Sequence, residues 1–561
     1  MEQIHSQNTS FALIKAMLVR KVMVPELYDL MSHCSKLMVT AHSVQVQKLC
    51  SQVFMKFIID YPLSSKRRQQ HLDELVLNLK YEYEGGRLSA LKTLLKVINK
   101  WPINALNEQC QTFFLHFTLR IANEDSIECR CILFDGLKHL ICKIGNSEYL
   151  QLCDYVIQWM EPRISLNSST IKIASASAQV ARIMLENRPL PWKGKNGQTL
   201  IEYTLNHVGS ESRTVEVDIL SQDSSSSISS ITNIVECDER VTTWRNNKCP
   251  PCPSDATWEI ALYSMQILET SLNVPFLSNI TTPSITECLS KQNIMLHTQH
   301  RIRVGASKLL GHVLASLMKM TKSSSSSFTT SIMNSDTKHE LLSKLCRQLE
   351  GSYLNVELTD TIVRNLVYLG RQTWDEETQQ KEENKSSLSS GPPLNWLFHR
   401  LSFLARKKRL DHDQDRFELR ATASMQWMAA MLQHNSTISI TYPKVILAPV
   451  FRLVNSERKE CSNTLRALAQ ELMEMLQSTM KVGGAEEGTF LKVHEEIRDK
   501  VTETKVERKK KRAQQRIVDP VGAAEYKMKR KEAKKRNRDK KKMSDGHHKK
   551  RRRNRANEDI L

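Results

Sequence analysis

The chain has 561 residues, of which 40% are hydrophobic, and it contains only 17 glycines and 16 prolines. This length is more than one hydrophobic core usually serves, so either several domains or an array of repeats is expected. All-β and Rossmann-type chains use more glycine and proline in their turns, so the composition disfavours both classes and favours helices joined by short loops.

The sequence gives no sign of membrane insertion or export. No window approaches twenty uninterrupted apolar residues, and the first ten residues lack the basic start and apolar stretch of a secretory signal. The 13 cysteines are scattered through apolar stretches rather than framing loops, which indicates reduced thiols. We therefore expect a soluble, intracellular chain.

Helical periodicity dominates the first 190 residues, with apolar residues recurring at intervals of three and four. The clearest runs are Val46–Phe57, Leu72–Leu79, Leu88–Ile98 and Leu133–Ile144. In the third run the predicted buried face is Leu88, Leu91, Leu95 and Ile98.

The spacing of these helices indicates a repeat. Alternate helices are predicted to start near Ser43, Arg87, Ser126 and Ser168. The intervals of 44, 39 and 42 residues match the period of about 40–47 residues in HEAT and armadillo repeats. In such repeats each helix pair buries its apolar face only by stacking on its neighbours. The predicted fold class is therefore all-α: a HEAT/armadillo-like α-solenoid with a disordered or partly helical basic C-terminal tail.

The rest of the chain is predicted to alternate between helical blocks and polar segments. After the repeats at 1–205 we expect a serine-rich, irregular linker at 206–255, helical repeats at 256–372 with a serine-rich loop at 321–336, a polar linker at 373–393, C-terminal helical repeats at 394–480, and a basic tail at 481–561.

The segment Cys249-Pro-Pro-Cys252 has the C-x-x-C form of redox and zinc sites. Redox chemistry requires a preceding strand and a helix N-terminus that lowers the thiol pKa, whereas prolines and asparagines surround this segment. The nearest further zinc ligands are Cys237, Cys288, His297 and His300. Their spacing is not that of a standard zinc site. A plain loop is the favoured interpretation, with a metal or redox role as the alternative.

No nucleotide-binding, metalloprotease or nucleophile-elbow motif occurs in the chain. We therefore predict that the protein is not an enzyme. We also predict no catalytic, cofactor-binding or metal-binding residues and no cofactor.

The C-terminal tail carries most of the charge. Residues 500–555 hold 25 Lys and Arg against 7 Asp and Glu, whereas the whole chain has a net charge of +20. A segment with so much like charge cannot form its own core. The predicted RNA-binding and nuclear-import residues are Arg508, Lys509, Lys510, Lys511, Arg512, Lys529, Arg530, Lys531, Lys534, Lys535, Arg536, Lys540, Lys541, Lys542, Lys549, Lys550, Arg551, Arg552 and Arg553.

These basic clusters are suited to phosphate groups and also have the form of nuclear import signals. Tyr526 is the only aromatic residue between positions 500 and 561, so a base-stacking platform is not expected. The predicted interaction is phosphate contact without sequence readout. The alternative is a solvated tail without a dedicated partner.

Several stretches, in order along the chain, resemble the small-subunit processome component 20 family. They are Gln45–Phe54 running into Asp60–Leu63, Leu79–Glu84 followed by Gly86–Leu91, Leu447–Arg452 with Asn455-Ser456, and Arg508–Arg512 followed by Asp519-Pro520, Ala523-Ala524 and a lysine-rich run. Members of that family are far longer, so the resemblance implies the C-terminal portion.

The resemblance implies a nucleolar HEAT-repeat scaffold of the small-subunit processome, which supports processing of pre-ribosomal RNA toward 18S rRNA. The implied partners are pre-ribosomal RNA, the small nucleolar ribonucleoprotein, other processome proteins and an import receptor, with no membrane and no small-molecule substrate. The implied localisation is the nucleus and nucleolus. The alternative function is an importin-type HEAT-repeat transport receptor or protein-interaction scaffold, although the near-neutral body and cationic tail differ from the acidic concave surface of importins.

Overall fold

The computed structural model describes residues 2–162, 167–222, 249–323, 333–351, 354–383, 393–406, 414–455, 461–486 and 488–518, and the single positions 524, 528, 531, 532 and 535. Within these residues every regular element is a helix, so the predicted all-α fold class is confirmed. The chain divides into two compact units, Met1–Trp427 and Met428–Leu561. In the described part, no helix has both the length and the apolar character needed to cross a bilayer.

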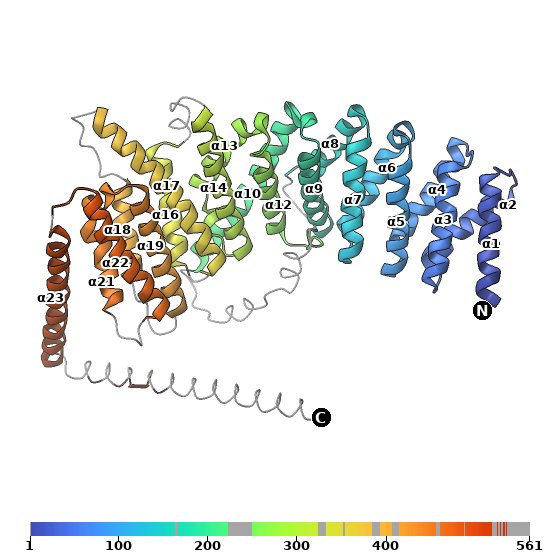
Figure 1. Ribbon diagram of the computed structural model, residues 1–561. Coiled ribbons are helices and arrows are strands. Elements are labelled where there is room, and N and C mark those ends of the chain that lie inside the picture. The colour runs from blue at the N-terminus through green and yellow to red at the C-terminus, as the bar shows by residue number, and fades with distance from the viewer. Residues whose placement is uncertain are drawn as a thin grey trace. The chain divides into compact units, whose positions relative to one another are not determined.

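The first unit is an array of helix pairs (Figure 1). It opens with α1 (Glu2–Val19). The pairs that follow are α2 (Glu26–Thr40) with α3 (Val44–Asp60), α4 (Ser65–Leu77) with α5 (Glu84–Lys100), α6 (Ile103–Ile121) with α7 (Ile127–Lys143), α8 (Asn146–Met160) with α9 (Ser168–Asn187), α10 (Lys195–Gln222) with α12 (Thr257–Ser271), α13 (Pro275–Lys291) with α14 (His300–Ser323), and α16 (Ser335–Glu350) with α17 (Val356–Glu383). Helix α18 (Pro393–Arg406) and most of α19 (Gln414–His434) complete the unit.

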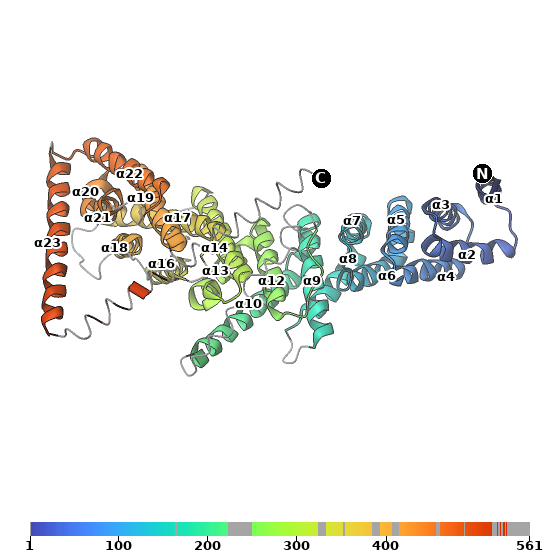
Figure 2. The same cartoon turned by 90° about the horizontal axis from the view of Figure 1, so that it is seen from below.

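The pairs stack in two rows. From α3 to α17, the second helix of each pair packs against the second helix of the next pair, and most of the first helices also contact one another. Figure 2 shows the two rows clearly between α2 and α8. The second helices α3, α5, α7 and α9 begin at Val44, Glu84, Ile127 and Ser168, within three residues of the predicted starts. The predicted HEAT/armadillo-like stacking is therefore confirmed.

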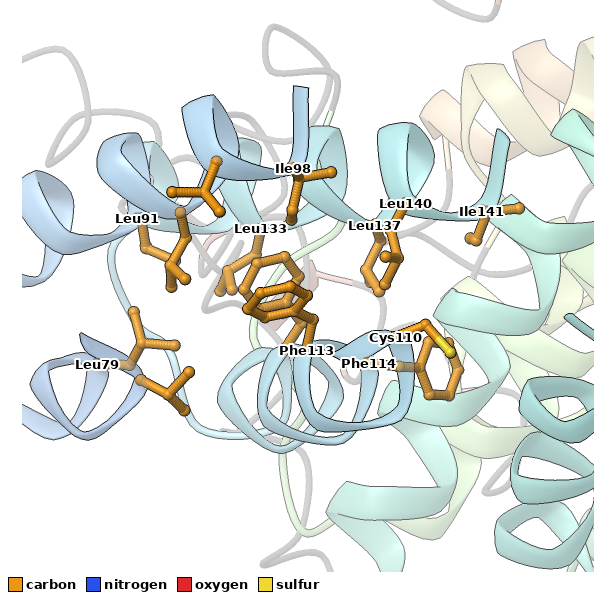
Figure 3. Close-up of a cluster of buried hydrophobic side chains, with 14 of the residues drawn as sticks. Leu79, Leu91, Ile98, Cys110, Phe113, Phe114, Leu133, Leu137, Leu140 and Ile141 are labelled. Atoms are coloured by element: carbon orange, nitrogen blue, oxygen red, sulfur yellow. The ribbon is translucent and has the colours of Figure 1, made fainter. Parts of the chain in front are cut away.

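Buried side chains between the rows form a continuous core. Figure 3 shows this core around α5, α6 and α7, where Phe113 and Phe114 of α6 face leucines and isoleucines of α5 and α7. The face predicted for α5 is only partly correct, because Leu88 and Leu95 are half-buried. Helix α5 packs against α3 on one side and α7 on the other, so its buried surface is wider than a single stripe. The fully buried residues of α5 are Ala90, Leu91, Leu94, Val97 and Ile98.

Cations from one pair bind the ends of helices in the preceding pair. The last carbonyl groups of a helix have no partner within that helix. Lys143 of α7 donates to three carbonyl oxygens at the end of α5, at 2.8–3.2 Å. Arg188, which follows α9, donates to two carbonyl oxygens at the end of α7, at 2.8 and 3.0 Å. These bonds therefore fix the register of successive second helices.

A buried carboxylate links two pairs in a similar way. Glu124, in the turn before α7, has no exposed surface. It accepts two hydrogen bonds from Arg87 of α5, at 2.8 and 3.0 Å, and one from Arg120 of α6, at 2.7 Å. Burial by itself would raise the pKa of Glu124, but these hydrogen bonds, together with one from the backbone of Ser126, outweigh it and hold the pKa below its ordinary value. The carboxylate is therefore ionised at neutral pH and joins the α4–α5 pair to the α6–α7 pair.

The division of the body into blocks and linkers stays a prediction, although two helices pass its boundaries. Helix α10 runs to Gln222, beyond residue 205, and α17 runs to Glu383, beyond residue 372. The stretch from Thr373 to Glu383 is polar, but it consists mainly of good helix formers and has no glycine or proline. Polarity alone therefore does not end this helix. The serine-rich Ser323–Ser327 run lies outside the described residues except for its first position.

The second unit is formed by α20 (Thr437–Thr441), α21 (Pro443–Val454), α22 (Asn463–Val482) and α23 (Thr489–Val518), together with the end of α19. Helix α21 packs against both α22 and α23. Between α22 and α23, Gly484 has φ of 85°, a left-handed conformation that favours glycine after a helix. The turn allows α23 to pack against α21.

Replacing Glu124 with glutamine should destabilise the protein at neutral pH by about 3–5 kcal/mol, because Arg87 and Arg120 lose their carboxylate. The wild-type pKa is lowered on folding, so the stabilisation is present above about pH 4.3 and is lost as the pH falls through the folded pKa. The difference in stability should therefore shrink on acidification. Urea unfolding followed by circular dichroism at several pH values measures this, with exposed Glu108→Gln as the control. A pH-independent difference would contradict it.

Candidate nucleic-acid interface

The first half of α23 is anchored to the second unit. Val493 and Ile497 are buried, with 7% and 6% of their surface exposed, on the side of α23 that meets α21. The His494 ring packs edge-on against Phe451 of α21, with ring centroids 5.1 Å apart. Apolar burial of this kind stabilises the docked helix without any charged contact.

An ion pair lies beside this apolar contact. Lys444 of α21 approaches Glu496 of α23, with Nζ and Oε2 2.7 Å apart. The hydrogen bond and the charge of Lys444 lower the pKa of the Glu496 carboxyl. Both side chains are about half exposed, so the pair orients α23 more than it stabilises it.

The second half of α23 differs in charge and exposure. Residues 489–500 contain three basic and three acidic side chains, whereas residues 501–518 contain seven basic and two acidic ones. Lys509, Lys510 and Lys511 are exposed, and Val506 is 50% exposed. Successive helix positions are rotated by about 100°, so these three lysines point in different directions around the helix. Helix α23 is therefore an anchored neutral half followed by an exposed basic half.

This geometry suits contact with phosphate groups. Lysine ammonium groups bind phosphate as point charges. Because the backbone is already helical, binding costs less backbone entropy than it would for a disordered segment. Residues 495–518 contain no aromatic side chain, so base stacking has no platform there. The arrangement can therefore neutralise a phosphate backbone but offers no aromatic platform for stacking bases.

The structure describes only part of the predicted basic set. The positions of Arg508, Lys509, Lys510, Lys511 and Arg512 lie within α23, and Lys531 and Lys535 are helical and exposed. The side chains of Arg508 and Arg512 lie outside the described part. So do Lys529, Arg530, Lys534, Arg536, Lys540, Lys541, Lys542, Lys549, Lys550, Arg551, Arg552 and Arg553. The anchoring residues of α23 were not singled out from the sequence, although Val493 and Ile497 have helical spacing.

The Cys249-Pro-Pro-Cys252 segment belongs to a non-helical strap, residues 249–256, which precedes α12. Arg130 of α7 donates to the carbonyl oxygens of Pro250 and Pro251 at 2.8 and 2.9 Å. Both cysteines are free thiols. Burial raises the pKa of Cys249 to about 12 and also raises that of Cys252, which opposes thiolate chemistry.

Metal binding has no support in the described residues either, where no group of three or more His, Cys, Asp and Glu side chains could hold an ion. His297 instead lies 3.2 Å from Glu211, measured between Nε2 and Oε1. His300 contacts the Asn355 side chain. Cys237 lies outside the described part. The described part of the strap is held by side-chain hydrogen bonds to its carbonyl oxygens.

Stacked helix pairs followed by a partly exposed basic helix define an α-helical repeat protein of the HEAT/armadillo type. Residues 270–545 match the family described as "Small subunit processome component 20 homolog, C-terminal". The resemblance found in the sequence is thereby confirmed: the chain is similar to the small-subunit processome component 20 family.

Two curated relatives extend the likeness. U3 small nucleolar RNA-associated protein 20 of Schizosaccharomyces pombe is 23% identical over 524 residues, which is 92% of this chain and 18% of that protein. The protein of the same name from Saccharomyces cerevisiae is 27% identical over 155 residues, which is 28% of this chain and 6% of that protein. The chain therefore spans less than a fifth of the length of these relatives.

Among solved structures, that of Kap121p bound to RanGTP overlaps with 87% of this chain and 50% of that chain, at 12% identity and a TM-score of 0.37. The crystal structure of SYS-1 overlaps with 81% of this chain and 85% of that chain, at 11% identity and a TM-score of 0.32.

Substituting Ile497 by aspartate should release α23 from α21, because the carboxylate would lie in an apolar contact without a partner. Backbone amides of residues 489–504 should then exchange with deuterium much faster than in the wild type. Hydrogen–deuterium exchange with mass spectrometry measures this. The matched control is Leu491→Asp on the same helix, because Leu491 is 63% exposed. Equal exchange in the two variants would show that α23 is not held by this contact.

Proposed function

We propose that the chain is a non-catalytic scaffold of the small-subunit processome. In this role it supports processing of pre-ribosomal RNA toward 18S rRNA and assembly of the small ribosomal subunit, and its basic tail contacts RNA. The match of residues 270–545 to the family described as "Small subunit processome component 20 homolog, C-terminal" supports the assembly role. The exposed basic half of α23, presented by an anchored neutral half, is the observation that carries the RNA contact.

The scaffold role follows from the architecture. An array of helix pairs exposes long rows of helices, and such arrays serve as extended surfaces for protein partners. The proposed partners are other processome proteins and a small nucleolar ribonucleoprotein. The relatives' name, U3 small nucleolar RNA-associated protein 20, supports the second of these.

The RNA contact is proposed to be electrostatic. Cations on α23 and on the segment beyond it would displace counterions from the phosphate backbone, which makes binding strongly dependent on salt. The same basic clusters are proposed to bind an import receptor, and the proposed localisation is the nucleus and nucleolus. The five clusters between residues 508 and 553 support both roles.

Replacing Lys509, Lys510 and Lys511 together by alanine should weaken binding to a labelled RNA hairpin and flatten its salt dependence. If all three lysines contact phosphates, the slope of log affinity against log salt should fall in magnitude by about 2.7, at about 0.9 per contact on duplex. Fluorescence anisotropy over a salt series measures this. The control removes three exposed lysines nearer the anchored region, Lys481, Lys492 and Lys500. If both triple variants lose the same RNA affinity, the effect would come from net charge alone and not from the position of Lys509, Lys510 and Lys511.

Crosslinking to RNA in cells tests the proposed function as a whole. With the tagged chain, sequenced crosslinks should be enriched in pre-18S spacer or small nucleolar RNA, and deletion of Lys505–Leu561 should remove that enrichment and release the protein from nucleoli. Binding to a Ran-type GTPase in a pull-down would instead support the importin-type alternative. A flat profile dominated by abundant mature RNAs would contradict RNA contact by the tail.

A further inference from the structure

An arginine–glutamine pair holds the strap in place. Arg130 of α7 donates through Nη2 to Oε1 of Gln179 on α9, at 2.9 Å. The same two side chains bind strap carbonyl oxygens: Arg130 binds those of Pro250 and Pro251, and Gln179 binds that of Pro251 at 3.3 Å. Two neighbouring second helices of the array thus bind the backbone of a non-helical segment with side-chain donors.

The next step along the array repeats this pair. Arg182 of α9 donates through Nη1 to Oε1 of Gln266 on α12, at 2.9 Å. The residue types, the donor group and the relation between neighbouring second helices are the same as for Arg130 and Gln179. The two pairs differ in exposure, since Arg130 is 1% exposed beneath the strap, whereas the Arg182 side chain is 38% exposed. They also differ in partners, since Arg182 donates through Nε to Glu186 at 2.8 Å, which leaves its Nη groups for other acceptors.

A cavity of about 410 Å³ lies beside the second pair. Its lining includes Arg182 and Gln266 together with Pro251 and Cys252, so it continues from the part of the array that holds the strap. The remaining lining comes mainly from α12 and α14. The cavity is large enough for a bulky side chain, and it lies next to the donors that a peptide backbone would need.

The lining from α12 and α14 is largely apolar, with Trp258, Leu262 and Val304 among its residues. Gly305 stands where the two helices approach closely, because a Cβ there would lie 3.1 Å from a Leu262 methyl carbon and 3.2 Å from the Met265 methyl carbon. The absent side chain therefore lets α12 and α14 pack closely, and the Leu262 and Met265 side chains already occupy the space over Gly305.

Charges at the cavity are balanced. Lys308 pairs with Glu357 at 2.9 Å, and Glu269, which also lines the cavity, pairs with His312 at 2.9 Å. Neither a polyphosphate backbone nor a highly charged peptide therefore has an electrostatic advantage here. Apolar contact and hydrogen bonds to backbone carbonyls are the interactions that the lining offers.

We propose that this cavity binds an extended, uncharged peptide segment of another protein. A bulky apolar side chain of that peptide enters the cavity and contacts Trp258, Leu262 and Val304, and the peptide's backbone carbonyl oxygens accept hydrogen bonds from Arg182 and Gln266. The strap supplies the precedent within the same chain and an interface with which the site is continuous. The bound peptide can contain proline, because proline lacks a backbone N–H but keeps its carbonyl group, and only carbonyl groups accept hydrogen bonds at this site.

Selection of a phage-displayed library of random dodecapeptides on the full chain tests the proposal. Enriched peptides, labelled with fluorescein, should bind the wild type by anisotropy. Arg182→Ala should weaken them by about tenfold or more, since it removes a charged hydrogen-bond donor. Gly305→Leu should have a similar effect, because its side chain would displace those of Leu262 and Met265, which line the cavity. Lys92→Ala, which changes an exposed lysine of α5, is the matched control and should bind like the wild type.

Thermal unfolding of each variant shows whether it is folded, and Arg182→Ala serves as the decisive variant if Gly305→Leu is unstable. The absence of enriched peptides would overturn the proposal. So would peptides that bind wild type and folded Arg182→Ala equally. A short labelled RNA could also be tested. If it binds in a way that depends on Arg182 and the selected peptides do not compete with it, the proposal that the ligand is a peptide would be overturned.

Discussion

The packing of each helix pair against the next pair is the constraint on which the first unit depends, because two helices cannot bury their apolar faces by themselves. The second helices α3, α5, α7 and α9 form a row whose facing side chains share one core. Polar contacts run in the same direction, since Lys143 and Arg188 each reach back to a carbonyl terminus of the preceding pair, and Glu124 joins two pairs through Arg87. Stability is therefore distributed between neighbours along the array.

The same stacking also produces the surfaces available for recognition. Successive second helices face one another along the array, so side-chain pairs can link each helix to the next. Arg130 with Gln179 and Arg182 with Gln266 are two such pairs, at different positions along their helices. One pair binds the strap of the chain itself, and the other stands beside a cavity.

Helix α23 illustrates how composition and packing divide one helix differently. Charge counting places a basic tail from residue 481, but residues 489–500 are balanced in charge and contribute Val493 and Ile497 to the second unit. The basic half begins only after the apolar contact with α21 has ended. The first half of α23 is anchored by its contact with α21, and the second half carries the cations. Because the backbone of the second half is already helical, less backbone entropy would be lost if it bound a phosphate backbone.

The sequence by itself determined the helical class, the repeat period and most of the buried stripes, among them Leu133–Ile144, because amphipathic spacing is a property of consecutive residues. It also located the polycationic segment, since charge density needs no structure. It predicted Leu88 and Leu95 to be buried, whereas both are half-buried, because the exposure of a side chain on α5 depends on how the helices on both sides pack. The roles of Arg130 and Glu124 were likewise decided only by tertiary structure. A buried charge is stable only beside its partners, and the strap carbonyl groups that Arg130 binds lie 120 and 121 positions away in the chain.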